Sequence, residues 1–477
     1  MTPRAYASPL CPLCSLWLNS IPFLRHRFCS PRRAEDKMKS SRLAGALFLL
    51  VLGIEHLAWA EDDRPLRALT LDQALAELDS QSPTLIQVRS RVADARALAT
   101  QARVPLVPTV VAAGGYTRNS ADAVVDFTGT PLASIHPGAL VIQPLGVWTV
   151  AGTVRVPLVI PNAWADWAAA QRAADAVAAT AESARLQLRA SLAQAAWAAA
   201  AAEEIVDVSE RAVTVADEHR RSAARGVTAG TEAPLSVLKA ETEVVKRQSD
   251  LAQARANCER SHLALGVLLG KSEPLRVLLP PVAGGEAPRQ LESLVAEALQ
   301  TRPELAAQEA QIRSAQAQAN SARLRWLPQI SGSGAVFAAD VPYPTGKKQG
   351  WRLTLDALWS LYDGGLARGK RDQAEADLVT ARAAAEAQRL SIVQEVQDTR
   401  RDVSVAKERL RLAEQQRDLA TAAAASAKRT FEAGVASSLD VLDANDRSYQ
   451  AELAMADARG RLGIARVALD KALGRMR

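Results

Sequence analysis

Two carboxylates stand three residues apart in the stretch FEAGVASSLDVLDAND, which runs from residue 431 to 446. If this stretch is helical, Asp440 and Asp443 lie one turn apart on the same face. Several assembled chains would then stack two rings of negative charge around an axis, and such rings attract cations. A simpler interpretation is that Ser437 or Ser438 caps a helix and Asp440 stabilises its positive N-terminus. Both interpretations can hold together.

No other reactive group in the sequence forms a recognisable site. The pair Cys11 and Cys14 has no partner ligands nearby, and Cys258 alone cannot form an internal disulfide. The histidines show no metal-ligand spacing, and no nucleophile motif is present. A hydrolase that used Asp440 and Asp443 would need further polar groups around them, and none is evident. We expect no enzyme activity, no catalytic residue, no cofactor and no metal site.

The positive charge of the chain is concentrated near its start. The net charge is +6, and the first sixty residues carry eight Lys or Arg and three Asp or Glu. The remainder is therefore close to neutral, which argues against nucleic acid as a partner. Residues 38–60 combine a charged start, a short apolar core and the ending Ala-Trp-Ala, and we interpret them as a secretory signal peptide. Residues 1–37 are interpreted as an upstream extension outside the mature protein.

The mature chain is an internal duplication. The segment that starts LDQALAELDSQSP at residue 71 matches LESLVAEALQTRP at residue 291, and the segment around Gly230 matches the one around Gly434. We divide the chain into a first repeat at 61–273, a linker at 274–290 rich in Pro and Gly, and a second repeat at 291–477. Two long copies of this kind indicate a duplicated unit with pseudo-symmetry.

Each repeat is expected to contain a very long helix followed by a return helix. The long helices are predicted at about 162–225 and 366–432, and each would reach about 100 Å at 1.5 Å per residue. Their alternating apolar stripes and charged faces are typical of a coiled coil. A glycine-containing break near 226–236 and another near 431–440 would reverse the chain, so each repeat forms an antiparallel helical hairpin.

Four strands are expected, at about 109–118, 148–158, 329–338 and 351–361. The segment WRLTLDALW shows period-two alternation, with Trp351 and Trp359 at the two ends of its apolar face. Eight residues of strand span about 26 Å, close to the roughly 25 Å apolar band of an outer-membrane barrel. Trp148 begins a similar alternating strand in the first repeat. A half-buried strand of a soluble protein is the alternative interpretation.

The first repeat must hold 16 residues more than the second between its matched segments, and we assign them to the connection at about 119–147.

Four strands cannot close a barrel that spans a membrane, because open edges would leave backbone groups unsatisfied in lipid. Several chains must therefore pool their strands, which implies a homo-oligomer with a shared barrel and a helical stalk.

The chain from about Arg67 to Gly474 resembles the TolC-type outer-membrane efflux proteins. The residues that carry the resemblance are LDQAL at 71–75, LPQI at 327–330, LYDGG at 361–365 and FEAGVASSLDVLDA at 431–444. Their order and duplication across almost the whole mature chain make the resemblance specific.

The resemblance implies a mainly α protein with a membrane β-barrel part, assembled as a homotrimer. Each protomer would contribute four strands to a shared 12-stranded barrel in outer-membrane lipid and two coiled-coil hairpins to a periplasmic tunnel. Such a channel is the passive exit duct of a tripartite efflux or type I secretion system. It docks onto a periplasmic adaptor protein and an inner-membrane transporter.

The resemblance also assigns roles to residues. Asp440 and Asp443 would ring the periplasmic entrance, and Trp148, Trp351 and Trp359 would lie at the membrane interfaces. The adaptor would contact the hairpin tips, including Gly230, Thr231, Leu235, Gly434, Val435 and Leu439.

Three positions depart from the pattern of the family. Ser236 stands where the second repeat has Asp440, and Phe431 and Ala436 replace the Tyr and Arg that lock the entrance of some relatives. The sequence thus predicts an entrance held by packing and coiled-coil twist alone.

A soluble periplasmic coiled-coil adaptor or scaffold is the alternative function. It is disfavoured by the Trp-bounded strands, which such a protein does not need.

Overall fold

The computed structural model describes residues 66–134, 139–280, 290–343 and 346–476. The predicted signal peptide and upstream extension lie outside these residues. The first half contains, in order, β1 (Arg67–Thr70), α2 (Leu71–Gln81), α3 (Pro83–Ala102), η1 (Val104–Leu106), β2 (Thr109–Arg118), β3 (Ala123–Asp126), η2 (Pro131–Ser134), β4 (Ala139–Gln143), β5 (Gly146–Val159), α4 (Pro161–Thr228), α5 (Pro234–Leu268) and β6 (Leu275–Leu278).

The second half repeats this order with fewer strands. It contains α6 (Leu291–Thr301), α7 (Pro303–Leu324), β7 (Gln329–Ala339), β8 (Gln349–Leu358), α8 (Leu366–Glu432) and α9 (Ser438–Ala472). The fold is therefore mostly helical, and α4 and α8 have 68 and 67 residues. None of the helices in the described ranges combines the length and the hydropathy that a bilayer crossing requires.

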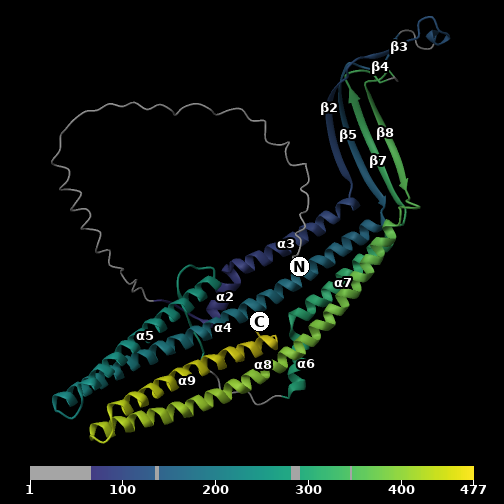
Figure 1. The fold of residues 1–477 in the computed structure, drawn as a ribbon. Helices are drawn as coiled ribbons and strands as arrows, with labels where there is room; N and C mark the ends of the chain where they lie inside the picture. The colour runs from purple at the N-terminus through teal and green to yellow at the C-terminus, as the bar shows by residue number, and fades with distance from the viewer. Residues whose placement is uncertain (1–65, 135–138, 281–289, 344–345, 477) are drawn as a thin grey trace, which may run out of the picture. The chain divides into compact units, whose positions relative to one another are not determined.

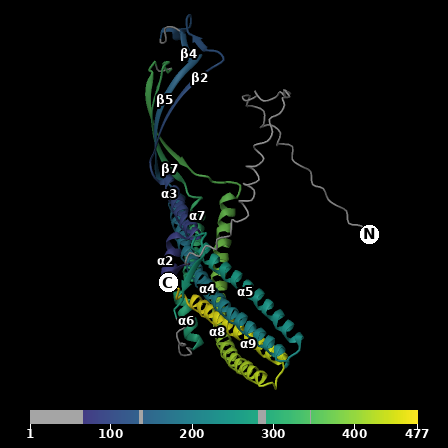
Figure 2. The ribbon, with the colours of Figure 1, turned by 90° about the vertical axis from the view of Figure 1, so that its left-hand side faces the viewer.

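The long helices pack as two antiparallel hairpins that lie side by side (Figures 1 and 2). Helix α4 packs against its return helix α5 and also against α9 of the other hairpin, while α8 packs against α9. Small residues allow this close approach, because alanine is the commonest buried residue of α4. Helices α3 and α7 extend the contact surface along α4 toward the strands.

The largest apolar core forms where the short helices cross the long ones. In the first half, the fully buried side chains of Leu78, Leu192 and Leu265 bring together α2, α4 and α5. In the second half, the fully buried side chains of Ile392 and Leu473 bring together α8 and the end of α9. Each fully buried Leu or Ile contributes about 1.5–3 kcal/mol. These cores fix the hairpins to the rest of the fold.

Strands β1 and β6 form a parallel pair that the sequence analysis did not predict. Leu275 and Val277 of β6 are buried in the first core, while Arg276 and Leu278 are not. The short strand LRVL was hidden because it lies within the segment that composition alone identifies as a linker. The predicted linker at 274–290 therefore begins with a structured element.

The main sheet has four antiparallel strands in the order β2-β5-β7-β8 (Figure 1). Directly opposed residues of an antiparallel pair share a face. The strand register places apolar or glycine residues on one face of all four strands, with Gln349 as a polar exception opposite Ala338. These apolar and glycine residues are Val110, Ala112, Gly114, Tyr116, Trp148, Val150, Gly152, Val154, Val156, Ile330, Gly332, Gly334, Val336, Ala338, Trp351, Leu353, Leu355 and Ala357.

No helix of the described chain covers this face, so its side chains stay exposed. The exposed fraction reaches 76% at Leu353 and 75% at Val110. The opposite face carries mostly small and polar residues, among them Thr354 and Asp356 of β8, with Val111, Phe337 and Leu358 as larger apolar exceptions. The outer edges of β2 and β8 pair with no described strand. The sheet is thus one-sidedly apolar and open at both edges.

The two strand connections differ in length, as the surplus residues predict. The segment between β2 and β5 covers residues 119–145, and the segment between β7 and β8 covers 340–348. The longer connection contains β3 and β4, which form a small antiparallel hairpin of their own. The sequence analysis assigned the surplus residues to this connection but did not predict the two strands within it.

Candidate functional site at the helical hairpin tips

Both hairpins reverse at a glycine in the left-handed conformation. Gly230 has φ of 76° and Gly434 has φ of 75°. A left-handed residue with a Cβ costs about 1–2 kcal/mol, so this conformation requires glycine even though a Cβ would meet no neighbouring atom. In the second tip, the Val435 amide donates to the Thr430 carbonyl at 2.9 Å and closes the end of α8.

The tips present apolar side chains to solvent. Val435 is 83% exposed, and the equivalent Leu235 and Leu439 are 58% and 59% exposed. Thr231 and both tip glycines are exposed as well. All six residues assigned to adaptor contact are therefore accessible in the protomer. Exposed apolar clusters on a polar rim are typical of protein interaction sites.

Asp440 belongs to a capping box at the start of α9. The Asp440 amide donates to the Ser437 hydroxyl oxygen at 3.3 Å, and the Ser437 amide donates to the Asp440 carboxylate at 2.9 Å. The Ser437 hydroxyl also donates to that carboxylate at 2.8 Å. This confirms the capping interpretation for Ser437. Ser438 does not cap the helix, and its hydroxyl contacts His219 instead.

The hydrogen bonds from the Ser437 hydroxyl and amide hold the pKa of Asp440 below its ordinary value of 3.8. Crowding of like charges in an assembly would act in the opposite direction. Within one protomer, the Asp440 carboxylate therefore remains ionised over the mildly acidic range.

Asp443 has a cationic partner on its own helix. Its carboxylate lies 2.9 Å from the Arg447 guanidinium, one turn further along α9. Both side chains are exposed, at 57% and 74%. The first tip differs, because Ser236 is buried and its hydroxyl donates to the Ala233 carbonyl at 2.7 Å. Acidic side chains at these positions are thus confined to the second hairpin.

A histidine of the first hairpin reaches the second hairpin just behind the tips. His219 of α4 is 6% exposed, and a hydrogen bond of 3.0 Å joins its Nε2 to the Ser438 hydroxyl. Its ring lies 5.6 Å from the ring of Phe431. Burial lowers the pKa of His219 from its ordinary value of 6.5, although the charge of Glu232 opposes the shift. The imidazole is therefore neutral at pH 7.

A cavity of about 260 Å³ adjoins this histidine. It is lined from α4 by Val215, Glu218, His219, Arg221, Ser222 and Arg225, from α8 by Lys428, Phe431 and Glu432, and from α9 by Val441 and Asn445. Lys428 lies 3.3 Å from Glu218 across it, so an ion pair also joins the two hairpins here.

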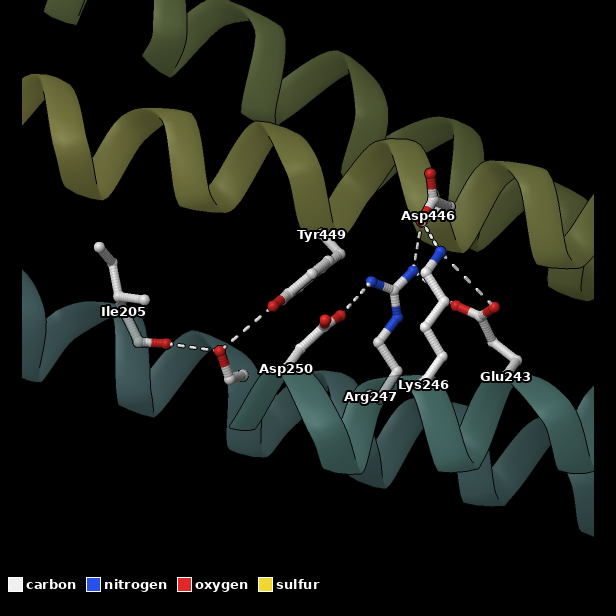
Figure 3. Close-up of polar contacts among 8 residues, drawn as sticks. Ile205, Glu243, Lys246, Arg247, Asp250, Asp446 and Tyr449 are labelled. Carbon is white, nitrogen blue, oxygen red and sulfur yellow. Dashed lines mark hydrogen bonds and ion pairs between the residues drawn. The ribbon is translucent and has the colours of Figure 1, made fainter. Parts of the chain in front are cut away.

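A buried arginine ties α5 to α9 further from the tips (Figure 3). Arg247 is 3% exposed. Its guanidinium lies 2.6 Å from Glu243 and 3.2 Å from Asp250 of its own helix. It also donates to Asp446 of α9, and Lys246 lies 3.3 Å from the same carboxylate. A buried guanidinium is tolerated only when charges of this kind compensate it.

Tyr449 extends the contact between the two hairpins. Its ring centroid lies 4.2 Å from the Arg247 guanidinium carbon, a cation–π geometry. Its hydroxyl lies 3.3 Å from the Ser209 hydroxyl, which donates to the Ile205 carbonyl of α4 (Figure 3). Charged and polar contacts therefore join the two hairpins of one chain in addition to their apolar packing, and the prediction that packing and twist alone hold the entrance stays a prediction.

Burial raises the pKa of Asp446, but hydrogen bonds from Arg247 and Lys246 outweigh this effect, so the pKa lies below its usual value.

Sequence reasoning missed the Arg247–Asp446 pair, since nothing in the sequence indicates which α5 residue faces α9. The Asp443–Arg447 pair was also missed, although its i,i+4 spacing is visible in the sequence.

The three Trp residues lie at the ends of the sheet. Trp148 and Trp351 are 61% and 73% exposed and lie within β5 and β8. Trp359 is the first residue after β8, although the predicted strand extended to 361, and its indole N–H donates to the Trp326 carbonyl at 3.0 Å. The pairing of β7 with β8 ends at Gln329 and Leu358.

Comparison with protein families gives a match over most of the chain. The family model described as outer membrane efflux protein matches residues 74–271 and 294–475. Among curated proteins, the chain is 30% identical over 240 residues to the outer membrane protein OprJ of Pseudomonas aeruginosa, covering 46% of this chain and 49% of OprJ. The chain thus spans about half the length of that relative.

The cobalt-zinc-cadmium resistance protein CzcC of Cupriavidus metallidurans is 26% identical over 321 residues, covering 64% of this chain and 72% of CzcC. Among solved structures, the outer membrane protein VceC of Vibrio cholerae superposes with a TM-score of 0.69 at 19% identity, covering 85% of this chain and 96% of VceC. The CmeC outer membrane channel of Campylobacter jejuni gives a TM-score of 0.71 at 14% identity, covering 85% of each chain. These structures share the fold.

Proposed function

This chain belongs to the outer membrane efflux protein family, and from that premise we propose that it is the outer-membrane exit duct of a tripartite efflux or type I secretion system. It acts as a passive channel without enzymatic chemistry of its own. Its sheet lies in the outer membrane and its helical hairpins extend into the periplasm.

The observation that carries this proposal is the sheet with one uncovered apolar face and two open edges. In water such a face would be an aggregation site, and in lipid an open edge would leave backbone groups without partners. Both problems disappear if three copies join edge to edge, β8 of one to β2 of the next. The product is a 12-stranded barrel whose apolar face contacts lipid and whose polar face lines the channel.

The Trp residues and the strand connections support the same orientation. Trp148 and Trp351 near one end of the sheet, and Trp359 at the other, would lie at the two membrane interfaces. The long connection at 119–145 is then on the cell exterior, where barrels of this type carry their longer loops.

The hairpin tips are the surface proposed to meet the periplasmic adaptor, which couples the duct to an inner-membrane transporter. Gly230, Thr231 and Leu235 of the first tip and Gly434, Val435 and Leu439 of the second are all exposed. Asp440 and Asp443 would then surround the periplasmic entrance of the channel.

Cell fractionation separates this proposal from a soluble periplasmic adaptor or scaffold. The full-length chain should be recovered with the outer membrane and resist extraction by high salt, because lipid contacts hold the apolar face. Recovery in the soluble periplasmic fraction would support the scaffold.

The exterior loop has its own test. Because Ser134 is exposed, a Ser134→Cys substitution in a Cys258→Ser background should react with an impermeant thiol reagent on whole cells. Labelling that occurs only after lysis would contradict this placement of the loop.

A further inference from the structure

The exposed side of α9 is a single stripe of charged, polar and small residues. Positions spaced alternately three and four apart share one face of a helix. Beginning at the second tip, the exposed residues at this spacing are Asp440, Asp443, Arg447, Gln450, Ala454, Asp457 and Arg461. The two carboxylates assigned to the entrance are therefore the first members of a stripe that also carries two arginines.

The stripe pairs its charges within the helix. Asp443 lies 2.9 Å from Arg447, and Asp457 lies 2.6 Å from Arg461. Both pairs have the acidic residue four positions before the basic one, which is the favourable orientation along a helix. Asp440, in contrast, accepts hydrogen bonds only from Ser437 among the residues that the structure describes.

We propose that Arg447 sets the charge selectivity of the entrance by offsetting Asp443, so that each protomer contributes the net charge of one carboxylate instead of two. This inference rests on the proposed function, in which α9 turns its exposed stripe toward the lumen of a trimer. Arg447 is a specificity-determining residue in this sense, and Asp440 supplies the uncompensated charge.

Distance explains why the two charges act as a sum. Residues 443 and 447 are about 6 Å apart along the helix axis. Ionic screening at physiological salt acts over about 8 Å, so a passing ion responds to both groups together. A trimer would therefore present about three net negative charges at this level, since six carboxylates are offset by three guanidinium groups. On this proposal the entrance carries about half the negative charge that two unpaired carboxylate rings would give.

The pair can be altered without large effects on folding. Both side chains are more than half exposed, and exposed ion pairs contribute little to stability. Neither residue takes part in the capping box at Ser437. Substitutions at 443 and 447 therefore report on the charge at the entrance and leave the start of α9 intact.

The test is the reversal potential of the purified full-length protein in planar bilayers under a KCl gradient. Arg447→Gln should raise the ratio of potassium to chloride permeability by at least about twofold, because one charge about 8 Å from an ion in water shifts its population by that factor. Asp443→Asn should lower the ratio by a similar factor. The double variant Asp443→Asn with Arg447→Gln should return to the wild-type ratio.

A control substitution and two outcomes keep the tests separable. Arg172→Gln removes an arginine from a similar exposed pair, with Asp175, near the opposite end of α4, and should leave the ratio unchanged. If the wild type conducts but Arg447→Gln keeps the same permeability ratio, the role of Arg447 is overturned while the proposed channel stands. The same conclusion follows if the double variant behaves like Asp443→Asn. A wild-type protein that forms no channel would overturn the proposed function together with this inference.

Discussion

The contact between Arg247 and Asp446 gives the sharpest prediction about how the two hairpins hold together. Helix α5 packs along α4 and meets α9 at only a few positions, so this pair is a main link between α5 and α9. The Arg247 side chain is 4% exposed, and the Asp446 side chain is 40% exposed. Asp446→Asn keeps the size of the side chain and removes the charge that faces the guanidinium.

The magnitude follows from burial. Breaking a fully buried ion pair costs about 3–5 kcal/mol. Here Asp446 is partly solvated, and Glu243 and Asp250 still face the guanidinium, so we expect about 1–2 kcal/mol. Since 1.4 kcal/mol is a factor of ten, the amides of α5 near Arg247 should exchange their hydrogens about tenfold faster.

Hydrogen exchange of the full-length protein measures this local opening directly. Asp443→Asn is the matched control, because it removes an exposed carboxylate from the same helix and should change exchange in α5 less than twofold. In a double-mutant cycle with Arg247→Met, the Asp446→Asn change should lose most of its effect. Equal acceleration in both single Asp variants, or an Asp446→Asn effect that persists without Arg247, would refute this reasoning.

Three further substitutions test other parts of the structure. Gly434→Ala should destabilise the second tip by about 1–2 kcal/mol, measured as faster local exchange, whereas Gly369→Ala within α8, where φ is ordinary and space is open, should not. Leu353→Arg should reduce recovery in the outer membrane, since a charge on the lipid face costs about 2–4 kcal/mol, while Thr354→Arg on the opposite face should be recovered normally. Burial lowers the pKa of His219 in the native contact between the hairpins. As pH falls through 6.5, the locally opened state therefore binds a proton that the native state does not, and the native contact loses stability. The protection factors of the amides near the tips should therefore fall below that pH, and His219→Gln should remove this dependence.

The arrangement of the long helices could be predicted from the sequence because the same pattern occurs in both halves of the chain. The two long helices carry the same apolar period over more than sixty residues, and Gly230 and Gly434 mark the reversals. The strand in WRLTLDALW was predictable because no residue in the described part of the chain covers it, so its alternation follows from its own two faces. Strands β1 and β6 were not predicted because four residues carry too little pattern, and their pairing depends on the core formed by α2 and α4.

The candidate site was predicted only where its contacts are local. The Ser437–Asp440 capping box joins residues three apart, and the sequence suggested it as one of two interpretations. The Arg247–Asp446 pair joins residues 199 apart, and the His219–Ser438 hydrogen bond joins residues 219 apart. Such contacts depend on how two helices are rotated against each other, which spacing within one helix does not determine.

Native mass spectrometry of the full-length protein extracted from the outer membrane tests the proposed duct most directly. The open edges of β2 and β8 require partners, and three chains that pair edge to edge satisfy them all. The proposal predicts a particle with three times the mass of one mature chain. A particle with the mass of a single chain, correctly folded and extracted from the same membrane, would contradict it.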